Sequence, residues 1–152
     1  MNVTLDQATR IVNAALAEGH THGFMPLTVA VLDAGGHIVQ IVREDGSGIM
    51  RADIALGKAW GALGMGASSR TLRDRLTDRP HFIAALTAVS QGRFVPVPGG
   101  VLVRDQTNRV VGAVGISGDT SEKDELCAIT GIRAAGLTPD PGDPLDWESS
   151  KL

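Results

Sequence analysis

Hydrophobic residues recur at helical spacing in five stretches of the chain, and each stretch predicts an amphipathic helix. The first begins at Thr4, which lies three residues before Gln7 and so fits a capping box, and it continues to Gly19. After Gly19 we expect a loop that contains His20 and His22. The other predicted helices cover residues 50–66, 68–77, 80–91 and 119–135.

Runs of β-branched and other apolar residues predict five strands between these helices. Residues 27–32 are apolar on both faces except for Thr28, which is typical of an interior strand that helices cover on both sides. Residues 94–97 are expected to form a short edge strand, because Pro96 and Pro98 cannot donate a hydrogen bond to a neighbouring strand. The other predicted strands are residues 37–42, 101–105 and 110–117.

Glycine is concentrated around the last two of these strands. Gly99 and Gly100 precede one of them, and Gly112, Gly115 and Gly118 follow each other at intervals of three along the other. Such glycines commonly let a twisted sheet pack closely against helices. An acid-rich helix start comes next, and the free N–H groups of a helix start can bind an anion or a carboxylate. The sequence leaves both interpretations open.

The composition indicates one domain built around aliphatic side chains. Of 152 residues, 43% are hydrophobic but only 3% are aromatic, so a nucleic-acid surface of stacking rings is not expected. The net charge of −3 also disfavours a nucleic-acid partner. No apolar run approaches the ~20 residues of a membrane span. A single cysteine, Cys127, and a first segment without signal-peptide features lead us to expect a cytoplasmic protein.

Several motifs occur in an order that is typical of one protein family. They are TVAVLDAGGH at residues 28–37, Arg43-Glu44-Asp45-Gly46, ALGKA at residues 55–59, Pro98-Gly99-Gly100-Val101, VGAVGISG at residues 111–118, and Asp124. From about residue 5 to residue 135 the chain resembles the GlcG/HbpS family, which includes haem-binding proteins and the C-terminal domain of PduO-type proteins. Two positions depart from the usual family pattern, since Glu44 stands where many relatives have Met and Leu102 where many have Pro.

The resemblance implies a profilin-like α/β (α+β) fold with three layers, α/β/α, around a central, mostly antiparallel five-stranded sheet. It also implies frequent homo-oligomers and, in some members, a site for haem or another small molecule. We expect this domain to cover residues 1–136. Residues 137–152 contain Pro139, Pro141 and Pro144 and are expected to form an irregular tail. Within the tail, Trp147 is expected either to anchor on a neighbouring surface or to be disordered.

The candidate ligand site combines cations, acids and backbone N–H groups at predicted strand ends and helix starts. Its members are Arg43, Asp45, Lys58, Gly99, Gly100, Ser117 and Asp124. A three-layer fold could bring these positions together in one recess, where a ligand with carboxylates would find hydrogen-bond partners. The alternative for Lys58 and Asp45 is a structural ion pair.

His20 and His22 are candidate ligands for a metal or a haem iron, because neutral imidazole is the commonest protein ligand for such centres. By the resemblance, one of them falls where some haem-binding relatives carry an axial histidine, at the end of the first helix. The alternative is a pair of solvated loop side chains.

Three hypotheses about function follow. The leading one is a homo-oligomeric protein that binds a small molecule, with haem as the possible cofactor and Arg43 or Lys58 meeting its carboxylates. The second is a cofactor-free enzyme acting on a small acid or aromatic catabolite, in which Lys58 or Asp45 transfers a proton. The third is a module for assembly alone, whose glycine-rich helix faces pack subunits together.

Overall fold

The computed structural model covers residues 1–152 and contains one five-stranded sheet. Its strands are β1 (Thr28–Asp33), β2 (Ile38–Arg43), β3 (Gly100–Arg104), β4 (Val110–Ser117) and β5 (Thr138–Asp140). They lie in the order β2-β1-β4-β3-β5, and each strand is antiparallel to its neighbours. The predicted antiparallel five-stranded sheet is confirmed.

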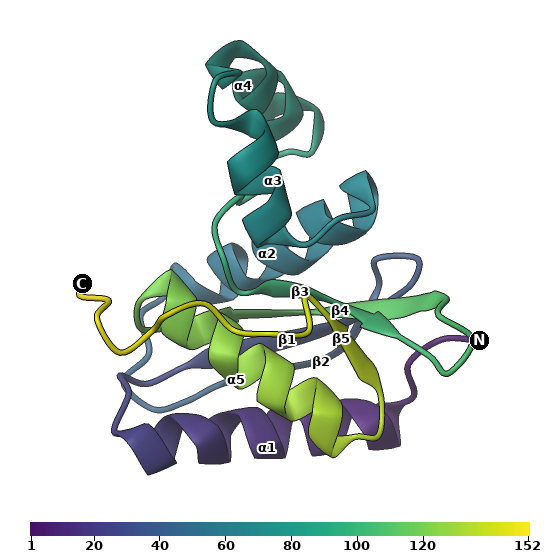
Figure 1. Ribbon diagram of the computed structural model, residues 1–152, viewed down its shortest axis with the longest axis vertical. Coiled ribbons are helices and arrows are strands. Elements are labelled where there is room, and N and C mark those ends of the chain that lie inside the picture. Colours follow the sequence, from purple (N-terminus) through teal and green to yellow (C-terminus); the bar gives the residue numbers. More distant parts are fainter.

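Helices cover both faces of this sheet (Figure 1). α1 (Leu5–His22) and α5 (Ser121–Ala134) pack side by side on one face, and α2 (Arg51–Met65) lies on the other. α3 (Ser69–Leu76) and α4 (Pro80–Val89) then project away from the sheet beyond α2. The predicted α/β/α layers are therefore confirmed. None of these helices combines the length and the apolar character needed to span a bilayer.

Each face of the sheet has its own hydrophobic core. Between the sheet and the α1–α5 layer, larger aliphatic side chains such as Ile11, Val29 and Ile129 are fully buried or nearly so. On the other face, α2 contributes mainly small residues such as Ala59 and Ala62. The small side chains let the backbone of α2 come close to the sheet.

Glycines in the sheet bring α2 within backbone contact. Gly100 on β3 and Gly115 on β4 lie opposite each other, and both face α2. A Cβ atom at Gly115 would lie 1.9 Å from the carbonyl oxygen of Ala55, and one at Gly100 would lie 2.3 Å from the carbonyl oxygen of Lys58. These two glycines thus serve close packing, and they hold Lys58 against the sheet.

Residues 94–97 do not form the edge strand that the sequence predicted. This segment crosses the outer face of α2, where Val95 donates its N–H to the carbonyl oxygen of Gly57 at 3.3 Å. Pro96 and Pro98 have no N–H to donate, so the segment has little capacity to join a sheet. It also covers two glycines of α2, because Cβ atoms at Gly57 and Gly61 would lie within 3 Å of the Val95 and Phe94 side chains.

The fifth strand comes instead from the segment that was expected to be an irregular tail. In β5, Thr138 lies opposite Arg104 and Asp140 lies opposite Leu102. The Arg104 guanidinium pairs with the Asp140 carboxylate at 2.9 Å. Pro139 is tolerated because β5 is an edge strand with one side unpaired. Residues 141–152 form no helix or strand.

Helix α1 is longer than its glycines suggested. It continues past Gly19 to His22 and ends at Gly23, whose φ of 67° is a left-handed conformation that favours glycine. Gly19 is a packing position instead, since a Cβ atom there would lie 2.9 Å from the Leu27 side chain. His20 and His22 therefore belong to the last turn of a helix rather than to a loop.

Candidate ligand-binding site

The structure places most of the predicted site residues in two separate clusters. Lys58, Asp124, Gly99 and Gly100 are buried between α2, the sheet and the start of α5, and we call them the enclosed cluster. A second set of residues lines an open groove at one end of the sheet, and we call it the His20 groove. Its lining residues are His20, Phe24, Pro26, Arg43, Glu44 and Asp45.

The centre of the enclosed cluster is an ion pair between Lys58 and Asp124. The Lys58 ammonium donates to Oδ2 of Asp124 at 3.0 Å and to the carbonyl oxygen of Ile116 at 2.9 Å. The other oxygen of Asp124 accepts the N–H of Asp119 at 3.0 Å. The sequence offered an ion pair between Lys58 and Asp45 as the alternative to a ligand site, and in the structure the partner of Lys58 is Asp124.

Burial dominates the electrostatics of this pair. Loss of hydration raises the pKa of Asp124 to about 6 and lowers the pKa of Lys58, while the opposite charge of each partner acts against these shifts. The side chains are only 2% and 1% exposed, so both are shielded from solvent in this structure. Lys58 and Asp45 are therefore not assembled in one pocket as the enzyme hypothesis required.

The polar groups around the enclosed cluster are also occupied by protein partners. The N–H of Gly100 donates to the Ser69 hydroxyl at 2.7 Å, and the Ser117 hydroxyl accepts a hydrogen bond from Arg51 at 3.1 Å. Ser69 and Arg51 were not among the predicted site residues. Nothing in their local sequence marks them, because both contacts depend on how α2 and α3 lie over the sheet.

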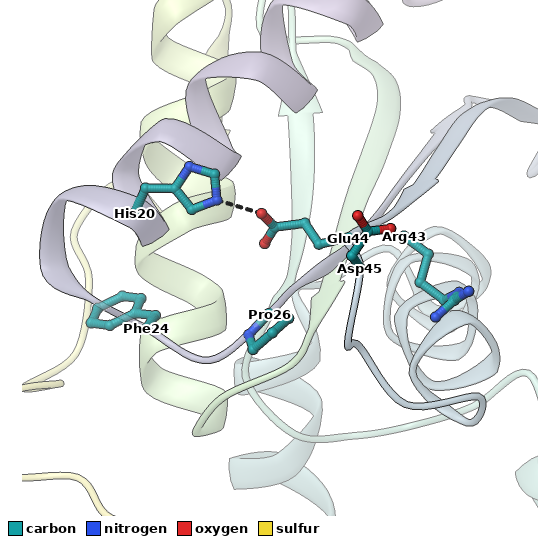
Figure 2. A pocket seen from close by; sticks show the side chains of 6 residues that line it. All are labelled: His20, Phe24, Pro26, Arg43, Glu44 and Asp45. Atoms are coloured by element: carbon teal, nitrogen blue, oxygen red, sulfur yellow. Dashed lines mark hydrogen bonds and ion pairs between the residues drawn. The ribbon is translucent and has the colours of Figure 1, made fainter.

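The His20 groove is built from three segments that lie far apart in the sequence. His20 comes from the last turn of α1, Phe24 and Pro26 from the connection to β1, and Arg43 to Asp45 from the end of β2. The cavity has a volume of about 520 Å³ and is open to solvent. Figure 2 shows His20 and Phe24 at one side of the groove and Arg43 at the other.

Glu44 is the polar centre of the groove. One carboxylate oxygen contacts Nε2 of His20 (Figure 2). The other accepts the N–H of Leu27 at 2.8 Å, which fixes the side chain. The neighbouring Arg43 donates one N–H to the carbonyl oxygen of Ser47 at 2.7 Å, and the guanidinium carries further N–H groups. Glu44 was recognised in the sequence only as a departure from the family pattern, not as a site residue.

His22 lies outside the groove although it is only two residues from His20. Its Nε2 is 3.0 Å from a carboxylate oxygen of Glu18. Its ring lies against two other rings, with centroid distances of 5.3 Å to Phe24 and 4.6 Å to Trp147. Trp147 therefore anchors on its own chain, and only His20 of the two histidines lines the groove.

Other metal-binding arrangements are absent from the chain. No group of three or more His, Cys, Asp or Glu side chains is placed to hold a metal ion. Cys127 is buried, and loss of hydration raises the pKa of its thiol far above the usual value. A thiol in this state is a core residue rather than a metal ligand.

Comparison with known proteins identifies the family of this chain. Residues 3–133 match the family described as haem degrading protein HbpS-like. The chain belongs to the HbpS-like family. This HbpS-like protein is also 30% identical over 130 residues to an uncharacterised 15.0 kDa protein of the dhaT–dhaS intergenic region of Citrobacter freundii, covering 86% of this chain and 89% of the relative.

Solved structures share the fold. The PduOC:Heme complex has a TM-score of 0.80 at 25% identity, covering 90% of this chain and 97% of that chain. Protein ORFY of Klebsiella pneumoniae has a TM-score of 0.78 at 28% identity, covering 88% and 90%. A double mutant of HbpS from Streptomyces reticuli has a TM-score of 0.74 at 28% identity, covering 88% and 86%. The family resemblance and the fold class predicted from the motifs are confirmed.

Proposed function

We propose that this HbpS-like protein binds haem, or a flat carboxylated ligand of similar shape, in the His20 groove. The observation that carries the proposal is the position of His20, whose imidazole lines an open cavity of about 520 Å³ together with Phe24 and Arg43. Cavities that bind small molecules commonly measure about 300–1,000 Å³. Membership of the HbpS-like family and the similarity to a haem complex support the same ligand.

The groove residues have the chemistry that haem requires. The His20 imidazole is a suitable axial ligand, and the Arg43 guanidinium is a suitable partner for the propionate carboxylates. Phe24 and Pro26 offer apolar surface to the macrocycle. When bound, haem would supply iron redox chemistry, while these residues would bind and orient it.

Glu44 imposes one condition on this binding. Its carboxylate occupies Nε2 of His20, and the side chain is held in place by the N–H of Leu27. An axial bond at the same nitrogen therefore has to replace the contact with Glu44.

Titration with hemin tests the proposal. We expect the wild-type protein to give a shifted Soret band that His20→Ala removes or weakens at least tenfold. His37→Ala is the control, because His37 is exposed and lies just before β2, at the opposite end of that strand from the groove, and it should keep the band. A Soret band that is unchanged in His20→Ala would contradict a role for this histidine as axial ligand.

A second proposal concerns assembly, and the observation that favours it is helix α4. This helix has a mostly apolar sequence, yet none of its residues is buried, and Val89 is 80% exposed. An apolar cavity of about 260 Å³ lies between α2 and α4 and includes Trp60, Leu86 and Phe94. Uncovered apolar surface of this kind is typical of protein interfaces. We infer that a second copy of the chain covers α4 in a homo-oligomer.

Light scattering combined with size-exclusion chromatography tests this second proposal. The wild-type protein should elute as an oligomer, and Val89→Glu should shift it toward the monomer by placing a charge in the interface. Asp74→Lys is a suitable control, because Asp74 is an exposed residue of α3 and also changes the charge of the projecting helices. A monomeric wild type would refute the interface.

A further inference from the structure

Residues 141–152, which we call the C-terminal strap, run along α5 after strand β5 (Figure 1). The domain holds the strap by polar contacts. Arg70 donates to the carbonyl oxygen of Asp143 at 2.7 Å, and the hydroxyls of Thr120 and Ser150 lie 2.7 Å apart. The strap lies beyond the part of the chain that matches the family, which ends at residue 133.

Trp147 is the side chain by which the strap reaches the rim of the His20 groove. The indole is half-buried, with its centroid 4.6 Å from that of His22 and 5.4 Å from that of Phe24. It meets the Phe24 ring at 71°, an edge-to-face arrangement that aromatic pairs favour. The Lys123 ammonium lies 5.2 Å from the centroid of the same Phe24 ring. Phe24 is therefore held by several neighbours.

Phe24 also belongs to the groove itself, where it contributes the aromatic surface. A ring that neighbouring side chains hold in one orientation loses less conformational freedom when a ligand packs on it. The contact with Trp147 thus connects the strap to the one aromatic wall of the cavity.

We propose that Trp147 is a positioning residue, which holds Phe24 as the wall of the His20 groove and so determines how long a flat aromatic ligand stays bound. This inference rests on the proposed function of the groove. It adds to that function a role for a segment outside the family match. Trp147 acts through Phe24 and does not itself line the cavity.

The first test measures the release of hemin from full-length protein to an excess of apomyoglobin. Trp147→Ala should release hemin about three- to tenfold faster than the wild type, the effect expected from the loss of one aromatic pair. Trp147→Phe retains a ring and should stay within about twofold of the wild type. Trp60→Phe changes the other tryptophan of the chain, on α2, and should have no effect. Thermal melting of each variant checks that the domain remains folded.

Two outcomes would overturn the inference while leaving haem binding intact. One is equal release from the wild type and Trp147→Ala, and the other is equally fast release from the Phe and Ala variants. A wild type without any His20-dependent Soret band would refute the proposed function instead.

A second measurement requires no ligand. In the NMR spectrum of the ligand-free protein, nuclear Overhauser effects should connect the Trp147 and Phe24 rings. Trp147→Ala should shift the Phe24 ring signals, because the ring current of the indole is lost, whereas Trp60→Phe should not. Unshifted Phe24 signals in Trp147→Ala would overturn the positioning role whatever the protein binds.

Discussion

The enclosed cluster and the His20 groove contain the same kind of pair, a basic side chain against a carboxylate, in opposite surroundings. Lys58 and Asp124 are 2% and 1% exposed, whereas His20 and Glu44 are 68% and 17% exposed. The buried ion pair is enclosed by the protein, and both of its side chains already have protein partners. His20 is open to solvent, so a ligand could replace Glu44 as its partner, which is why the proposed ligand site is the groove and not the enclosed cluster. Burial, rather than residue type, separates a structural pair from a candidate site.

Removing the buried cation should have the largest effect on stability. Lys58→Met leaves the Asp124 carboxylate buried without its partner, which should lower the free energy of unfolding by about 3–5 kcal/mol. Denaturation with urea measures this change. The double variant Lys58→Met/Asp124→Leu should recover most of the loss, because neither charge is then buried. A loss below about 1 kcal/mol in Lys58→Met would mean that the pair behaves like an exposed one.

The same variant should show a distinctive dependence on pH. In the wild type, burial raises the pKa of Asp124 from 3.8 to about 6, and loss of the Lys58 charge should raise it further. Above pH 6 the native variant then binds more protons than its unfolded state, so its free energy of unfolding falls as the pH rises. The loss in the free energy of unfolding caused by Lys58→Met should therefore be smaller at pH 6 than at pH 8, by about 1.4 kcal/mol if the pKa of Asp124 rises from about 6 to about 7. The double variant lacks this carboxylate, so its difference from the wild type in the free energy of unfolding should not become smaller at pH 6 in this way.

A methyl group between α2 and the sheet should disturb the enclosed cluster without changing a charge. In Gly115→Ala the new Cβ atom would lie 1.9 Å from the carbonyl oxygen of Ala55, so α2 has to move outward. We expect a loss of about 1–3 kcal/mol in the free energy of unfolding, as for other overpacked cores. Gly64→Ala is the control, because its nearest neighbour would be the Trp60 ring at 3.8 Å. That variant should be stabilised by up to about 1 kcal/mol, since Ala favours a helix over Gly.

The fold could be predicted from the sequence to the extent that it depends on local patterns. The apolar runs of β1 and β4 and the helical spacing of α1 identify their elements without knowledge of the partners. The fifth strand could not be found in this way. β5 is short, contains Pro139, and exists because the edge of β3 is free and Arg104 can pair with Asp140.

The candidate site could be predicted in its chemistry but not in its partners. The sequence placed Lys58 in a ligand site and gave an ion pair with Asp45 only as the alternative, because Asp45 and Asp124 are equally acidic in the sequence. Which of the two carboxylates meets Lys58 depends on how closely α2 approaches the sheet. Gly100 and Gly115 set this approach through contacts with residues that are distant in the sequence. The His20–Glu44 contact likewise depends on the end of α1 lying beside the end of β2.

Changing Glu44 should have the smallest effect on stability and the most informative effect on binding. Glu44→Gln keeps an oxygen that can accept the N–H of Leu27, but it removes the charge next to His20. Because His20 is 68% exposed and the amide oxygen keeps the hydrogen bond from Leu27, the free energy of unfolding should change by less than about 1 kcal/mol. Because Glu44 occupies Nε2 of His20, we expect hemin to bind about two- to fivefold more tightly to the variant in a Soret titration. Weaker binding would contradict this competition. It would mean that Glu44 orients the His20 ring through one nitrogen while the other ring nitrogen binds the metal.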